Sequence, residues 1–342
     1  MKKSAAVVTG CLLTVILFAF GKEFSSGSLK GLEICAEILI PSLFPFMVAA
    51  ALTSAGDIPQ FIKNKLSPIM KFFFRQQADA AFAVLIGLFG GYPAGVKTAV
   101  SLYESGKITR EQARRLNLFC VNAGAGFCVN AIGNGLLNSR KSGLILLFSL
   151  CISAVILGFF TRGKKEDYLT PPQIIGIPFS EALVKSVSSS STAMLGICAF
   201  VTLFSGIIAV LSTLGIKENI LLFLCCILEV TSGCAQAAGK VSLPSIAAIC
   251  AFGGICVHMQ VFSLGKNLMP DMGKFCLYRL LHAALAWITC SVLLFFFPVE
   301  LQTVSIMTQN AAPVSFSVPA AVSMLFLSAL LILDLDTNRK VC

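Results

Sequence analysis

Long apolar runs without charged residues alternate with short polar segments along most of the chain. A membrane-spanning helix needs roughly 20 consecutive apolar residues. Runs of about this length that lack Asp, Glu, Lys and Arg occupy 4–21, 38–56, 80–96, 116–139, 142–161, 186–216, 241–265, 280–299 and 301–333. The pattern predicts an all-α polytopic membrane protein with about eight spans and two re-entrant hairpins.

Two of the apolar segments are interrupted at their centres. The segment 80–103 contains GGYPAG, and the segment 219–239 contains EVTSG. Glycine and proline break a helix, and the freed backbone groups survive at membrane depth only inside protein or beside a water-filled cavity. We therefore expect both segments to form broken helical hairpins that enter and leave on the same side.

The overall composition supports the membrane assignment. Of the 342 residues, 56% are hydrophobic and only 12% are charged. A soluble domain has about 25% charged residues, so a soluble enzyme, a DNA-binding domain and a disordered scaffold are excluded. The fourteen cysteines are scattered and include no C-x-x-C pair, and there are two histidines. We interpret the cysteines as small hydrophobic residues and expect neither a metal nor a cofactor.

The positive charge of the chain follows its predicted topology. With the N-terminus in the cytoplasm, 18 of the 26 lysines and arginines fall on the cytoplasmic side, and Lys97 and Lys185 remain at membrane depth. This bias follows the positive-inside rule and accounts for the net charge of +10 without a nucleic-acid partner. Residues 1–21 lack a clear cleavage site, so we favour a signal anchor, with cleavage as the alternative.

The chain also contains an internal repeat. GGYPAGVKTA (90–99) matches LEVTSGCAQAA (228–238), and AGAGFCV (123–129) matches AFGGICV (251–257) in the same order. Upstream, the prolines of ICAEILIPSLFPF and the serine run of LVKSVSSSSTAML hold equivalent places, where each is expected to interrupt a helix. Chance similarity of short glycine-rich strings is the alternative.

The predicted topology starts the first copy outside and the second inside. An inverted repeat of broken helices is the architecture of secondary transporters, with a substrate site near the midplane. The predicted organisation is an N-terminal helix, a first repeat, a second inverted repeat, and a C-terminal helix with a cytoplasmic tail, at 1–27, 28–165, 166–300 and 301–342.

Two charged residues in the broken segments are candidates for substrate and ion binding. Lys97 follows GGYPAG, where a new half-helix with free N–H groups would begin, so it predicts an anion site; the alternative is a side chain that extends to the cytoplasmic surface. Glu229 in an apolar segment should bind a coupling cation, titrate, or form an ion pair with Lys97. The sequence alone does not distinguish among these three roles of Glu229.

Polar uncharged residues give further candidates. Ser189 and Ser190 lie in a serine run that, if unwound, offers hydroxyls to a polar ligand, although small residues also allow close helix packing. Asn122, Asn130 and Gln260 place amides at membrane depth, where they bind substrate or join helices. Enzyme signatures such as G-x-S-x-G and H-E-x-x-H are absent from the sequence, and we expect no enzyme activity.

Four motifs together resemble the YlbJ-type sporulation integral membrane proteins, which carry a nucleoside-recognition or "gate" domain. They are IPSLFPF, GGYPAGVKTA, LYESGKITREQARRLNLFCVNAGAGF and EVTSG, and the resemblance covers about 28–300. It implies a distant similarity to spore maturation proteins and concentrative nucleoside transporters. It also implies movement of dipicolinate across the outer forespore membrane. The positions that match the family pattern are Gly91, Tyr92, Pro93, Gly95, Lys97, Asn122, Gly124, Gly126, Glu229, Thr231 and Gly233.

These observations lead to one functional hypothesis and three alternatives. The hypothesis is a secondary transporter that moves a small anionic, dipicolinate-like solute across a bacterial cell membrane by alternating access. The alternatives are a non-transporting scaffold for spore envelope maturation, a nucleoside-type transporter, and a lipid-modifying enzyme. The expected partners are the solute, membrane lipids and, if the chain self-associates, a second copy.

Overall fold

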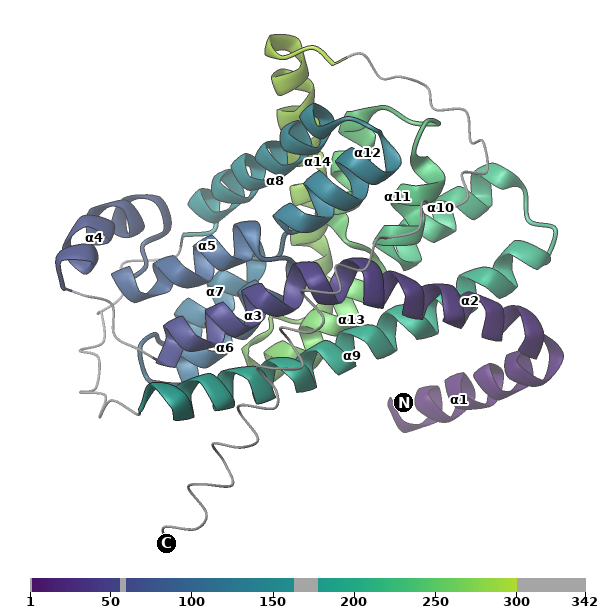
Figure 1. The fold of residues 1–342 in the computed structure, drawn as a ribbon, viewed down its shortest axis with the longest axis horizontal. Coiled ribbons are helices and arrows are strands. Elements are labelled where there is room, and N and C mark those ends of the chain that lie inside the picture. Colours follow the sequence, from purple (N-terminus) through teal and green to yellow (C-terminus); the bar gives the residue numbers. More distant parts are fainter. Residues whose placement is uncertain (1, 56–59, 163–177, 300–342) are drawn as a thin grey trace, which may run out of the picture. The chain divides into compact units, whose positions relative to one another are not determined.

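The computed structural model describes residues 2–55, 60–162 and 178–299, and these residues form only helices (Figure 1). The predicted all-α class is confirmed. The chain divides into two units near residue 303, and the described residues belong to the first. The expected C-terminal helix at 301–333, with its tail, and the expected domain boundary at 165 lie outside the described residues.

The helices fall into two successive groups along the chain. The first group is α1 (Lys2–Ala19), α2 (Gly21–Ile34), η1 (Cys35–Leu39), α3 (Ile40–Ala55), α4 (Gln60–Phe74), η2 (Ala78–Ala80), α5 (Ala81–Phe89), α6 (Tyr92–Glu104), α7 (Arg110–Phe119), η3 (Gly126–Leu136) and α8 (Arg140–Phe160). The second group is α9 (Phe179–Thr213), α10 (Glu218–Leu228), α11 (Val230–Ala237), α12 (Leu243–Phe252), α13 (Gly254–Gly265), η4 (Lys266–Leu268) and α14 (Met272–Phe296).

The described residues contain several helices that are long and apolar enough to span a membrane. Four meet this criterion, namely α8, α9, α12 with α13, and α14, and two bent helix pairs raise the number to six. Of the eight expected spans, 142–161, 186–216, 241–265 and 280–299 correspond to these four helices, and 4–21 forms part of one bent pair. The run 38–56 contains the 16-residue α3, the run 116–139 is broken between α7 and η3, and 301–333 lies outside the described residues. In one bent pair, α1 turns by 102° into α2. The expected boundary at residue 27 therefore falls inside α2.

Both predicted breaks are confirmed, while the expectation that each segment enters and leaves the membrane on the same side stays a prediction. The first breaks between α5 and α6 at Gly91, whose φ of +107° favours glycine. A Cβ built on Gly95 would lie 2.6 Å from the Cα of Gly87. The second breaks at Glu229, which is extended, and a Cβ on Gly233 would lie 2.7 Å from the Cα of Cys226. Residues on either side of each break are thus in contact, so each segment folds back on itself.

A second break follows each hairpin, and the two breaks of each half meet. In the first half, the chain is irregular from Cys120 to Gly124, and a Cβ on Gly124 would lie 2.8 Å from the amide nitrogen of Gly91. In the second half, a Cβ on Gly254 would lie 3.2 Å from the amide nitrogen of Glu229. The order of hairpin, broken helix and long helix therefore occurs twice. The inverted relation of the two halves stays a prediction.

Two expected interruptions are wrong. The serine run does not unwind, because α9 is one helix of 35 residues. Its hydroxyls bond to the preceding turn, as Ser189 does to the carbonyl of Ser186 and Thr192 to that of Ser188, which satisfies them without breaking the helix. The chain also stays helical through Pro41, after the wider π-helical turn η1, in which the N–H of Ile40 bonds to the carbonyl of Cys35.

A single buried arginine joins the two broken helices α7 and α12. Arg279 on α14 is 1% exposed. Its Nη2 donates to the carbonyl of Leu118 at 3.1 Å, and its Nη1 donates to the carbonyls of Val121 and, at 3.3 Å, Ala251. These carbonyls lie at or just beyond the C-terminal ends of α7 and α12, where orphan carbonyls and the helix dipole favour a cation. One guanidinium therefore donates hydrogen bonds to carbonyl groups at the helix breaks of both halves of the fold.

Replacement of this arginine should destabilise the protein strongly. Arg279→Met leaves three buried carbonyls without a donor, at a cost of about 1–3 kcal/mol each. We expect a large drop in the thermal unfolding temperature of detergent-purified protein, whereas Arg140→Met, at the exposed start of α8, should leave it nearly unchanged. Equal unfolding temperatures for the two variants would show that the guanidinium contacts do not support the fold.

Glycine 95 offers a test of the hairpin geometry. A Cβ at this position would collide with the carbonyl oxygen of Cys120 and with the backbone of Gly87, and neither is a side chain that can move aside. Gly95→Ala should therefore cost about 1–3 kcal/mol of stability. Gly196→Ala is the matched control, because a Cβ there meets nothing within 4 Å. If both variants unfold at the wild-type temperature, the close approach of α5 and α6 is incorrect.

Candidate functional site

Three consecutive cavities lie along one face of α9. We call them the Lys97 cavity, the central cavity and the Lys30 cavity, with volumes of about 380, 30 and 500 Å³. The lining positions recur every three or four residues, as expected for one helix face. They are Ser189, Thr192, Ala193, Gly196, Ile197 and Phe200 for the first, Ile197 and Val201 for the second, and Ser205, Ile208, Ala209 and Ser212 for the third.

The helical run from α2 through η1 to α3 forms the opposite wall in the reverse direction. Ala51 lines the Lys97 cavity, Leu39 and Leu43 line the central cavity, and Lys30 lines the third. Figure 1 shows this run beside α9.

Adjacent cavities share lining residues. Ile197 and Gln260 line both the Lys97 cavity and the central cavity, and Phe127 and Thr231 line both the central cavity and the Lys30 cavity. The three cavities therefore form a series with the smallest in the middle.

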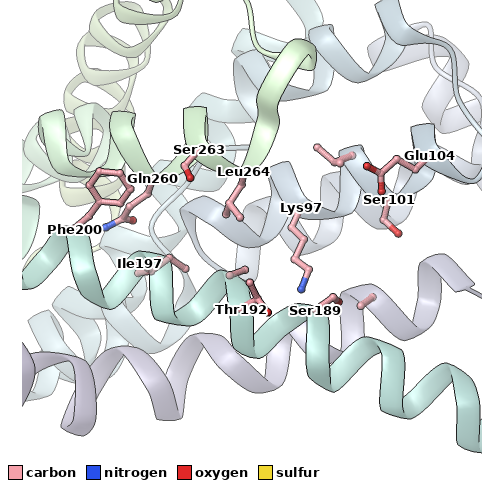
Figure 2. A pocket seen from close by; sticks show the side chains of 14 residues that line it. Lys97, Ser101, Glu104, Ser189, Thr192, Ile197, Phe200, Gln260, Ser263 and Leu264 are labelled. Carbon is pink, nitrogen blue, oxygen red and sulfur yellow. The ribbon is translucent and has the colours of Figure 1, made fainter. Parts of the chain in front are cut away.

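The Lys97 cavity combines one half-buried amine with several polar groups. The Nζ of Lys97 donates to the Oγ of Ser190 at 2.8 Å. Figure 2 shows Lys97 extending from α6 toward Ser189 and Thr192 of α9, with Gln260 nearby on α13. The expected position of Lys97 at a helix start is wrong, because α6 begins at Tyr92 and Lys97 is its sixth residue. Its ammonium group, without free backbone N–H groups, provides the positive charge of this cavity.

The central cavity lies where the hairpin breaks of the two halves meet. Tyr92 and Pro93 from α6 line it together with Glu229 and Thr231 from the second hairpin. The hydroxyl of Tyr92 donates to the carbonyl of Cys250 at 2.7 Å, which ties the first hairpin to α12. A volume of about 30 Å³ is enough for roughly one water molecule. The series of cavities is therefore closed at this point to any organic solute.

Glu229 caps the helix that follows it. Its carboxylate is buried, with one oxygen accepting from the N–H of Thr231 at 2.9 Å and the other from the N–H of Ser232 at 2.7 Å. These contacts place a negative charge at the positive end of α11. Within the described residues the carboxylate makes no ion pair with Lys97, and the two side chains line different cavities. A role in ion coupling stays a prediction.

Four of the residues expected at the site, Gly95, Asn122, Asn130 and Ser190, line none of these three cavities. Gly95 packs against the backbone at Cys120 and Gly87. Asn122 is buried in the break after α7, and its amide has no hydrogen-bond partner among the described residues. Asn130 is exposed on η3. Thus Tyr92, Lys97, Ser189, Thr231, Glu229 and Gln260 line the cavities, Ser190 joins them only through its hydrogen bond with Lys97, and Gly95, Asn122 and Asn130 lie apart.

The cavities also contain residues that the sequence did not single out. Lys30, Ser205 and Gln236 line the Lys30 cavity. One sequence pattern could have indicated Ser205: small and hydroxyl-bearing residues recur at helical spacing along one side of the apolar helix α9. Among the described residues, no group of three or more His, Cys, Asp or Glu side chains is arranged to hold a metal ion.

Comparison with known proteins gives one relative. No family model matches the chain, and no solved structure matches it. The chain is 24% identical over 233 residues to the sporulation integral membrane protein YlbJ of Bacillus subtilis (strain 168), which covers 62% of this chain and 57% of the relative. The similarity and the several apolar helices support a YlbJ-type relationship for this chain, which is a multi-pass integral membrane protein.

Proposed function

We propose that this chain is a secondary transporter for a small anionic solute in the membrane of a sporulating cell. The observation that carries the proposal is the series of three cavities, with a closed point where the breaks of both hairpins meet. Broken helices that meet around a site are typical of secondary transporters. A cavity on each side of a closed centre is the arrangement that alternating access requires.

Positions that are equivalent in the internal repeat line the Lys97 cavity and the Lys30 cavity. This correspondence supports a mechanism in which one cavity opens while the other closes. The repeat that aligns Gly126 with Gly254 also aligns Ile132 with Gln260 and Leu136 with Leu264. Gln260 and Leu264 line the Lys97 cavity, and Ile132 and Leu136 line the Lys30 cavity. Similarly, Lys97 aligns with Ala235, and each lines its own cavity. Each half of the fold thus contributes equivalent positions to one cavity.

The charged residues that line the cavities are Lys97 and Glu104 in the first, Glu229 at the centre and Lys30 in the third. Lys97 is only partly exposed and bonds to a neutral hydroxyl, so its charge is available to an anion. The charge of Glu229 is already offset by the N-terminus of α11, so it repels an anion less. The relative is a sporulation integral membrane protein, which supports a role for this chain in sporulation. Together with the resemblance, this makes dipicolinate, a small aromatic dicarboxylate, the proposed solute.

Neutralising Lys97 should impair uptake. In proteoliposomes that contain the purified protein, we expect Lys97→Gln to raise the KM for labelled dipicolinate about tenfold, since a hydrogen bond to a charged group contributes roughly 1.5–3 kcal/mol. Lys185→Gln is the control, because Lys185 is exposed on α9 and pairs only with Glu181 within the described residues. Absence of dipicolinate uptake by the wild-type protein contradicts the proposed function. Uptake by Lys97→Gln equal to that of the control removes Lys97 from the site.

Glu229 should act as a helix cap in this transporter. Glu229→Gln keeps one acceptor oxygen for two N–H donors, so we expect a lower unfolding temperature, with a loss of about 1 kcal/mol, and no change in the dependence of uptake on Na⁺ or pH. Calorimetry and uptake under imposed ion gradients measure the two effects. Loss of the ion dependence at an unchanged unfolding temperature would instead assign Glu229 to ion coupling.

A further inference from the structure

The Lys30 cavity has a polar end that the sequence did not indicate. It is the largest of the three cavities, and α2, η3, α9 and α11 all contribute to its walls. Lys30 is the sole charged side chain among the described residues that line it, and it makes no ion pair with any described residue. The hydroxyl-bearing Thr231 and Ser232 face it from the first turn of α11. The positive charge of this cavity is therefore not offset by a lining carboxylate.

Ser205 and Thr202 are the two residues of α9 whose buried hydroxyls have no hydrogen-bond partner among the described residues. Ser212 and Ser189 each donate to a carbonyl three residues earlier in α9. The Oγ of Ser205 has no hydrogen-bond partner among the described residues, although the residue is only 6% exposed. A buried polar group without a partner is costly. Of Thr202 and Ser205, only Ser205 lines the Lys30 cavity, which makes its hydroxyl the candidate donor to a molecule bound there.

Close packing of α2 on α9 brings Lys30 and Ser205 to the same place. A Cβ on Gly31 would lie 2.9 Å from the Oγ of Ser205, and a Cβ on Gly27 would lie 2.6 Å from the carbonyl oxygen of Ser205. The absence of side chains at Gly27 and Gly31 therefore lets the serine approach the turn of α2 that carries Lys30. An ammonium group and an unpaired hydroxyl donor at one cavity end are suited to a carboxylate.

We propose that the Lys30 cavity is a second binding site for the carboxylate substrate, across the central closure from Lys97, and that Lys30 and Ser205 bind the substrate there. This inference rests on the proposed function and extends it. A solute released from Lys97 when the centre opens meets a second lysine on the other side. Glu104 shares the cavity of Lys97, whereas no carboxylate lines the Lys30 cavity among the described residues, so the preference for an anion over a cation or a neutral nucleoside is set mainly at Lys30.

Sided transport measurements test this proposal. Proteoliposomes with a uniformly oriented transporter allow the KM for dipicolinate to be measured from either face. We expect Lys30→Gln to raise the KM about tenfold from one face and Lys97→Gln to raise it from the other, with a smaller increase of about threefold for Ser205→Ala. Lys22→Gln is the matched control, because Lys22 is exposed on α2, two turns before Lys30, and lines none of the three cavities.

The outcomes separate this inference from the proposed function. If the wild-type protein transports dipicolinate and Lys30→Gln behaves like Lys22→Gln from both faces, the second site is refuted and the transporter stands. An effect of Lys30→Gln and Lys97→Gln on the same face also refutes it. Equal competition by uridine and by dipicolinate overturns the anion selectivity. Because Lys30 is exposed, its replacement should leave the unfolding temperature in detergent unchanged, and Lys30→Arg should restore binding.

Discussion

Helices that break at membrane depth leave carbonyl and amide groups without partners, and this chain satisfies them with two buried charges. Arg279 donates to carbonyls at or just beyond the ends of α7 and α12. Glu229 accepts the first free N–H groups of α11. In a membrane each unsatisfied backbone group costs several kcal/mol. These two side chains therefore offset the cost of the free backbone groups at the breaks. The remaining architecture depends on the breaks.

In the proposed transporter, the breaks determine where the solute binds. Because the hairpins end near the middle of the fold, α6 and α11 do not fill the space on both sides of the centre, and a cavity remains on each side. The unbroken α9 and the run from α2 to α3 pass alongside and complete both cavities. Thirteen residues line the central cavity, among them Tyr92, which bonds to α12. In the proposed function, movement of one half against the other opens this point.

Local features of the sequence predicted local features of the structure. GGYPAG and EVTSG located both hairpin breaks, because few residue types tolerate such backbone and the surrounding runs are strongly apolar. The predicted interruption at the serine run was wrong, because serine hydroxyls that donate to carbonyls of the preceding turn are compatible with a continuous helix. The role of Arg279 could not be read from the sequence, because its partners lie 28 to 161 residues away. Lys30 and Ser205 meet only through the packing of α2 on α9.

The central claim is that one solute path runs between two cavities through the point where the hairpins meet. A cryo-electron microscopy map of the protein in lipid nanodiscs with dipicolinate tests it most directly. The account predicts that both hairpin breaks lie near the bilayer midplane, that the Lys97 and Lys30 cavities face opposite sides, and that solute density lies beside one of the two lysines. Cavities that open to lipid or to the same side, with no solute density beside either lysine, would contradict it.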